Sequence, residues 1–193
     1  MTDFFALLQL PVTFDLDVAT LEQHYRAQQQ QFHPDRFATH AVEQQRWSME
    51  QATQLNEAWQ TLREPLARAV YLLQRMGYQP VSAEQGRGDQ DAAFLMQVME
   101  WREALAEIDP ATAAALPQLV ALRQQMEREM EQVFAHLAAL FKAVCGADQT
   151  DRSQLEPMAR LIDQQRYRRR FLAEIDQIEE QVVERIESDQ HGG

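Results

Sequence analysis

The tripeptide His33-Pro34-Asp35 holds the side chains of this sequence whose chemistry is most specific. An imidazole donates or accepts hydrogen bonds, and a carboxylate pairs with an arginine of another protein. The proline between them fixes the backbone, and with it the relative direction of the two side chains. The three residues therefore suit recognition of a partner protein. Taken alone, they also fit an ordinary helix-ending turn in which Asp35 is solvated.

Other residues with reactive or metal-binding side chains lack the spacing that catalysis or metal binding needs. The histidines form no His/Cys pattern for zinc, and the sequence contains no Gly-rich phosphate loop and no GxSxG motif. Cys145 is the only cysteine, so it forms no internal disulfide and no thiolate cluster. Three glutamates at alternate positions do not converge on one helix face, namely Glu127, Glu129 and Glu131. We therefore expect no enzymatic activity, no cofactor and no metal site.

Two amphipathic helices are predicted to hold the tripeptide between them. Before it, apolar residues recur at helical spacing, namely Val18, Leu21, Tyr25 and Phe32. After it, a second series has the same period, namely Met49, Ala52, Leu55, Asn56, Trp59 and Leu62. Pro34 disfavours the α conformation at His33 and so ends the first helix. The tripeptide is therefore expected at the exposed tip of a helical hairpin.

The second half of the sequence predicts three further helices. They cover about Asp91–Ile108, about Leu116–Val144 and a stretch that begins near Ser153. Ser153 and Glu156 have the spacing of a capping box, and Pro157 is expected in the first turn, where its missing N–H costs little. Three such helices can close an antiparallel bundle.

Composition indicates an all-α protein with two domains. Only 6 of the 193 residues are Gly, helix-forming residues are abundant, and no run alternates as a strand does. Three of the glycines fall in residues 77–89, which are predicted to be a linker. The linker would join a domain of residues 1–76 to a domain of residues 90–193.

Charge and hydropathy disfavour several classes of partner. The net charge is −12 at pH 7, and phosphate binding requires a basic face, so nucleic acid is not expected as a partner. One dense basic cluster lies among acidic residues and is expected to pair with neighbouring helices; it comprises Arg166, Arg168, Arg169 and Arg170. No apolar run reaches about 18 residues, and the start lacks the basic segment of a signal peptide. We expect a cytoplasmic protein that does not bind membranes.

Around the tripeptide the sequence resembles the J-domain proteins, which activate Hsp70 chaperones. The resemblance rests on four ordered stretches, namely Asp3–Leu8, Gln31–Phe37, Asn56–Leu62 and Arg63–Ala69. It implies that residues 1–76 form a J domain whose tripeptide stimulates ATP hydrolysis by an Hsp70. The implied Hsp70-binding residues are His33, Pro34, Asp35, Tyr25, Arg26 and Arg36. J domains usually have a markedly basic second helix, whereas here Arg26 is its one firm cation, which favours a dedicated Hsp70 over a general one.

Over nearly its whole length the chain resembles the HscB family of iron–sulfur co-chaperones, in which a J domain is followed directly by a helical bundle. The resemblance extends to Asp91–Leu105 and Arg170–Leu172, and the cysteine-rich extension of eukaryotic members is lacking, which suggests the bacterial type. It implies two partners, an HscA-type Hsp70 and the IscU-type scaffold protein on which clusters are assembled. The cluster would belong to the scaffold. The implied scaffold-binding residues are Leu95, Met96, Met99, Glu100, Glu103, Glu107 and Phe171.

Periodicity alone allows another interpretation of the second half. The apolar residues of the proposed scaffold-binding stripe would then be bundle core, and its glutamates a solvated face. Leu95 borders both sets. Two alternative functions also stay open: a J protein that delivers a different client to a general Hsp70, and a helical interaction module unrelated to chaperones. We expect a monomer.

Overall fold

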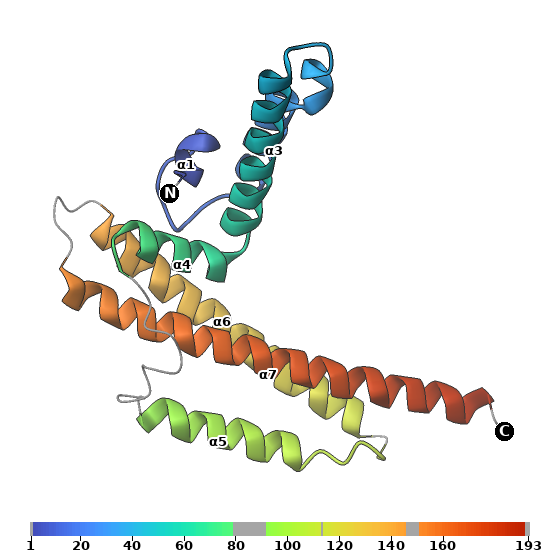
Figure 1. The fold of residues 1–193 in the computed structure, drawn as a ribbon. Coiled ribbons are helices and arrows are strands. Elements are labelled where there is room, and N and C mark those ends of the chain that lie inside the picture. The colour runs from blue at the N-terminus through green and yellow to red at the C-terminus, as the bar shows by residue number, and fades with distance from the viewer. Residues whose placement is uncertain (1, 79–91, 113, 146–150, 192–193) are drawn as a thin grey trace. The chain divides into compact units, whose positions relative to one another are not determined.

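The structure, a computed structural model, describes residues 2–78, 92–112, 114–145 and 151–191. Within these ranges the chain is helical and contains no strand, which confirms the predicted all-α class (Figure 1). The chain divides into two compact units. Unit 1 comprises Met1–Tyr78 and Leu137–Met158, and unit 2 comprises Gln79–His136 and Ala159–Gly193. The predicted linker at 77–89 lies almost wholly outside the described residues, so the domain boundary placed there stays a prediction.

Unit 1 contains the predicted helical hairpin. Its elements from the first part of the chain are α1 (Phe4–Leu7), α2 (Val18–Phe32), the 3-10 helix η1 (Pro34–Phe37), α3 (Val42–Arg63) and α4 (Pro65–Arg75). Helix α3 is the centre of this group, because α1, α2, η1 and α4 all contact it. The fully buried side chains that join these helices include Phe5, Leu8, Leu21, Leu55, Leu62 and Leu72.

Acidic caps begin the short helices of unit 1. The carboxylate of Asp3 accepts hydrogen bonds from the N–H groups of Phe5 and Ala6 and also pairs with Arg75 of α4, 2.5 Å away. Partial burial alone would raise the pKa of Asp3, but the Arg75 guanidinium and the two amides outweigh it and lower that pKa. Asp17 caps α2 in the same manner through the N–H of Thr20.

Arg68 and Phe14 complete the core of unit 1. The Arg68 side chain is 4% exposed, and its guanidinium donates to the carbonyls of Leu62 and Phe14 at 2.7 and 2.5 Å. The ring of Phe14 stacks on that of Phe141, with centroids 5.2 Å apart. This contact is one physical reason why residues 137–158 group with the N-terminal helices rather than with the rest of the second half.

The second half contains three helices, as predicted: α5 (Ala92–Ala106), α6 (Ala115–Val144) and α7 (Arg152–His191). Unit 2 consists of α5, α6 up to His136 and α7 from Ala159 onward. Within the unit they run side by side and alternate in direction (Figure 1), and each pair is linked by at least one hydrogen bond that involves a side chain. The core comprises Trp101, Leu105, Ala115, Leu119, Leu122, Met126, Phe171, Ile175 and Val182.

The start of α7 differs from its prediction. The helix begins at Arg152, and Asp151 accepts hydrogen bonds from the N–H and the hydroxyl of Ser153, so Ser153 and Glu156 do not form the predicted capping box. Pro157 consequently lies inside the helix, in its second turn, and not in the first. A proline there removes the amide that would bond to the carbonyl of Ser153. None of the described helices combines the length and the hydrophobicity needed to cross a membrane.

Candidate functional site

The backbone around His33 places the tripeptide between α2 and η1. Helix α2 ends at Phe32, and His33 is extended (φ −60°, ψ 126°), as Pro34 requires of the residue before it. The Nδ1 atom of His33 accepts a hydrogen bond from the N–H of Asp35 at 3.3 Å. A neutral imidazole that accepts at Nδ1 carries its proton on Nε2, so the far edge of the ring is a hydrogen-bond donor.

His33 and Asp35 of the tripeptide face solvent. The side chain of His33 is 50% exposed and that of Asp35 is 91% exposed. The Asp35 carboxylate lies 3.6 Å from Nδ1 of His33, which is too far for a strong ion pair and leaves its lone pairs for another protein. The predicted exposed tip is therefore confirmed for these two side chains.

Aromatic contacts hold the two sides of the tip together. The ring of Trp47 on α3 meets Phe32 just before the tripeptide and Phe37 just after it, at centroid distances of 5.6 and 5.9 Å. The amide of Gln45 donates to the carbonyls of Ala38 and His40 at 3.0 and 2.9 Å. The loop is thus attached to the start of α3 on both sides of the tripeptide.

The remaining predicted Hsp70-binding residues lie along α2 and η1. The hydroxyl of Tyr25 donates to Asn56 at 2.6 Å, and its ring stacks on Trp59. Arg26 pairs with Glu22 at 2.5 Å. Arg36 donates to the carbonyl of Gln30, which satisfies a group at the end of α2. Arg26 is exposed but has an acidic neighbour, so the exposed face of α2 carries little net positive charge.

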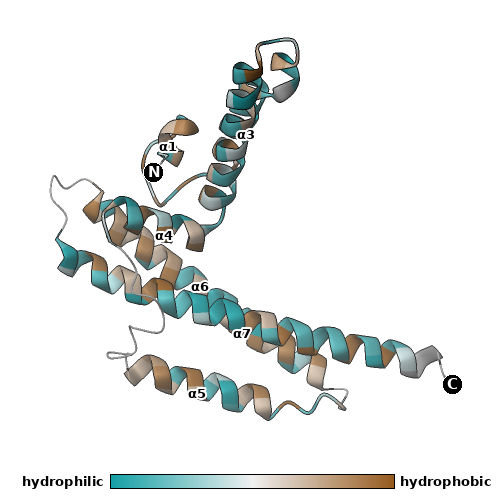
Figure 2. Cartoon of the chain, in the orientation of Figure 1, coloured by the Kyte–Doolittle hydropathy of each residue, from teal (hydrophilic) through white to brown (hydrophobic). Residues whose placement is uncertain are grey.

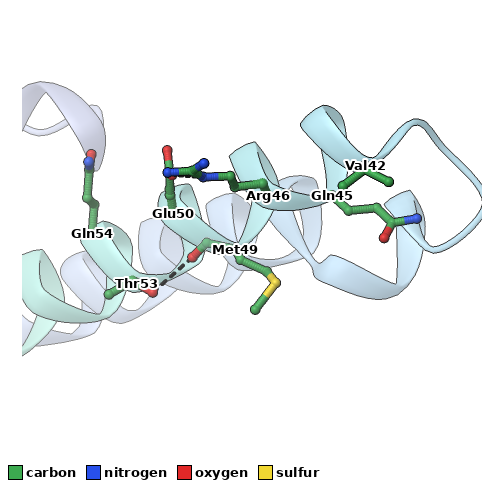
Figure 3. Close-up of a pocket in the computed structure, with 7 residues that line it drawn as sticks. All are labelled: Val42, Gln45, Arg46, Met49, Glu50, Thr53 and Gln54. Atoms are coloured by element: carbon green, nitrogen blue, oxygen red, sulfur yellow. Dashed lines mark hydrogen bonds and ion pairs between the residues drawn. The ribbon is translucent and has the colours of Figure 1, made fainter.

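A pocket on the surface of unit 1 is lined by residues of α3 (Figure 3). Its lining residues are Val42, Gln45, Arg46, Met49, Glu50, Thr53 and Gln54. The charged pair Arg46 and Glu50 bond to each other at 3.0 Å, and the Thr53 hydroxyl bonds to the carbonyl of Met49. Among the described residues, no cluster of three or more His, Cys, Asp or Glu side chains could hold a metal ion.

Helix α5 of unit 2 has two distinct faces. Trp101 and Leu105 are buried in the unit's core at 3% and 8% exposure. Leu95, Met96 and Met99 are 43%, 65% and 61% exposed, so the structure puts them on the surface and not in the core. Glu100, Glu103 and Glu107 are exposed beside them. We call the three apolar residues with these three glutamates the α5 stripe; Figure 2 shows the hydrophobic start of α5.

Phe171 is not part of the α5 stripe. It is 1% exposed, and its ring lies 6.0 Å from that of Trp101 and 5.2 Å from the Arg102 guanidinium. The family resemblance implies that Phe171 binds the scaffold, but the Arg102 side chain and Trp101 of α5 lie against its ring and cover it. Its place in the structure is beneath α5, where it supports the helix that carries the stripe.

Sequence reasoning did not identify the residues that support the two surfaces. Trp47 and Gln45 hold the tip, and Arg168 of α7 lies under α5, where it donates to Gln97 on the inner face of that helix. For Trp47 a usable signal existed: it is a large aromatic residue among the polar residues at the start of α3, which indicates a packing contact. Arg168 belongs to the basic cluster expected to pair with neighbouring helices, but no local signal marks its burial, which depends on α5 and α6.

A helical hairpin that presents His-Pro-Asp at its tip, with a short helix before it and another after it in the chain, defines a J-domain protein. Comparison with known proteins narrows this class. Residues 90–176 match the family model described as "HSCB C-terminal oligomerisation domain".

Two curated relatives are both described as "Co-chaperone protein HscB homolog". The one from Cupriavidus taiwanensis is 45% identical over 141 residues, which are 73% of this chain and 78% of the relative. The one from Burkholderia thailandensis is 46% identical over 145 residues, which are 75% of this chain and 79% of the relative. The chain therefore belongs to the HscB co-chaperone family.

Solved structures agree with this assignment. "Chaperone HscB from Vibrio cholerae" has a TM-score of 0.76 and 31% sequence identity, with 94% of this chain and 99% of that chain covered. The human co-chaperone protein HscB has a TM-score of 0.75 at 24% identity, covers 91% of this chain and 81% of its own, and is evidence for the fold alone. These relatives are named as co-chaperones and not as enzymes.

Proposed function

We propose that this protein stimulates the ATPase of an HscA-type Hsp70 and delivers an IscU-type iron–sulfur scaffold to it. The tripeptide and the adjoining face of α2 would bind the Hsp70. The α5 stripe would bind the scaffold. Binding both proteins at once raises the effective concentration of the scaffold near the chaperone, so that hydrolysis traps it there.

One observation carries this proposal: a single chain exposes both surfaces. His33 and Asp35 present a hydrogen-bond donor and a free carboxylate at the tip. Separately, the α5 stripe exposes two methionines at more than half of their area beside three glutamates. Flexible methionines adapt to an apolar partner surface, and a carboxylate rim favours a partner with basic groups nearby.

The test is single-turnover ATP hydrolysis by the HscA-type Hsp70, with this protein and the scaffold added separately and together. We expect synergistic stimulation that is lost in His33→Gln, because a flexible amide does not keep the ring geometry of the exposed imidazole, and the change does not touch the core. His40→Gln is the matched control, since His40 is an exposed histidine of the same loop. Circular dichroism of His33→Gln should match the unchanged protein.

Other outcomes would reassign parts of the molecule. Stimulation that ignores the scaffold would keep the J-domain role and give the α5 stripe to a different client. Since the matching family model is described as an oligomerisation domain, sedimentation of the protein alone should accompany the assay. A dimer that Met99→Ala dissociates would assign the stripe to a second copy of this chain.

A further inference from the structure

A buried guanidinium lies directly under the α5 stripe. Arg168 of α7 is 4% exposed, and its guanidinium carbon is 5.1 Å from the ring centre of Phe94 and 5.3 Å from that of Trp101. One of its terminal nitrogens donates to the side-chain carbonyl of Gln97 at 3.3 Å. Phe94, Gln97 and Trp101 follow one another at spacings of three and four, so Arg168 contacts the inner face of α5 over about two turns.

The charge on Arg168 is only partly compensated. Its Nε lies 4.0 Å from the Glu129 carboxylate, beyond hydrogen-bond distance, and Nε and Nη1 have no hydrogen-bond partner among the described residues. Burial lowers the pKa of Arg168, and the nearby Glu129 offsets this only in part. A buried ionic group of this kind is often no more stable than an apolar residue of similar volume. Stability alone therefore does not account for a guanidinium at this position.

A guanidinium at this position can fix the orientation of α5. Trp101 and Leu105 also make apolar, non-directional contacts with the core, and Arg102 of α5 donates to Tyr167 and Glu174 of α7 at 3.2 and 2.7 Å. A guanidinium is planar and donates in fixed directions, so its contacts with the Phe94 and Trp101 rings and its bond to Gln97 restrict the orientation of α5 against it. Gln97 in turn donates to Glu129 of α6 at 3.2 Å, which links the same position of α5 to a second helix.

We propose that Arg168 is a positioning residue that sets the rotation of α5 about its own axis and so keeps Leu95, Met96 and Met99 facing outward. The inner contacts at 94, 97 and 101 alternate along the helix with the exposed positions 95, 96 and 99. A rotation of one residue, about 100°, would therefore turn part of the stripe toward the core. The partner named in the test rests on the proposed function, but the orientation of α5 does not.

The first measurement needs no partner. Hydrogen–deuterium exchange of the α5 amides is compared in the full-length protein and in Arg168→Met, an uncharged residue of similar length. We expect faster exchange across α5 in Arg168→Met while the melting temperature stays equal or rises. Arg123→Met is the matched control: Arg123 pairs with Asp176 and Glu179 of α7, and its loss should leave α5 exchange unchanged.

The second measurement is calorimetric titration with the cluster scaffold. Arg168→Met should bind about 3- to 10-fold more weakly. Arg168→Lys keeps the charge but not the planar fork, and should recover only part of the affinity.

Two outcomes would overturn the inference. One is unchanged α5 exchange in Arg168→Met. The other is a parallel loss of melting temperature and affinity, which would indicate a purely structural role. If Met99→Ala binds the scaffold as tightly as the unchanged protein, the proposed function fails, and the exchange result still decides the role of Arg168.

Discussion

At the scale of single residues, exposure separates those that can meet a partner from those that support them. Met99 and Phe171 both follow from the family resemblance as scaffold-binding residues. The structure gives them different places, because Met99 is 61% exposed and Phe171 is 1% exposed. A partner can contact Met99 directly, whereas Phe171 can affect binding only through its packing against α5.

The two substitutions should therefore behave differently. Phe171→Ala empties a core position between Trp101 and Arg102 and is expected to lower the free energy of unfolding by about 3–5 kcal/mol. Met99→Ala is expected to change it by less than about 0.5 kcal/mol, while weakening scaffold binding by about 1–3 kcal/mol. Denaturant titration and calorimetry measure the two quantities. Equal destabilisation by both changes would contradict this assignment, and Ile186→Ala serves as an exposed apolar control.

At the scale of elements, α3 does more than form half of the hairpin. Its residue Trp47 bridges the chain before and after the tripeptide, through Phe32 and Phe37. The His-Pro-Asp turn thus depends on a helix that begins several residues later. Packing from α3, as well as the proline, keeps the loop in one conformation.

Trp47→Ala should loosen the tip without unfolding the hairpin. We expect faster amide exchange in residues 35–40 and a roughly 3- to 10-fold higher concentration for half-maximal ATPase stimulation, with the maximal rate retained. Trp47→Phe keeps an aromatic ring at this position and should behave much like the unchanged protein in both measurements. Met49→Ala, a nearby exposed residue of α3, is the control. If Trp47→Ala leaves amide exchange in the loop unchanged, then Pro34 and Gln45 are sufficient to hold the loop.

At the scale of the whole molecule, charge sets how partners approach. The chain carries a net charge of −12, and the one firm cation of α2, Arg26, has Glu22 beside it. Long-range attraction to an acidic chaperone surface is consequently weak. Recognition of the Hsp70 should depend on the contacts of the tip more than on electrostatic steering.

Binding to the Hsp70 should therefore depend little on salt. We expect the affinity to change by less than about threefold between about 50 and 300 mM salt. Glu22→Gln removes the acidic partner of Arg26 and should raise both the affinity at low salt and the salt dependence. Surface plasmon resonance at several ionic strengths measures both. A steep fall in affinity for the unchanged protein would mean that cations elsewhere in the chain contact the chaperone.

The sequence by itself determined the helices and the tip of the hairpin. Both are local: apolar spacing sets which stretches are helical, and Pro34 ends α2 whatever surrounds it. The start of α7 was harder, because Asp151 and Ser153 are both competent caps and only the observed geometry chooses Asp151.

Only the tertiary structure decided which residues of the second half face a partner. Periodicity places Leu95 between core and surface and cannot show that Arg102 and α5 cover Phe171. It cannot show that Arg168 is buried against two rings of α5, nor that residues 137–158 join the N-terminal helices. The physical reason is the same in each case. A helix's own period defines its faces, but burial of a face is a property of the neighbours that pack against it.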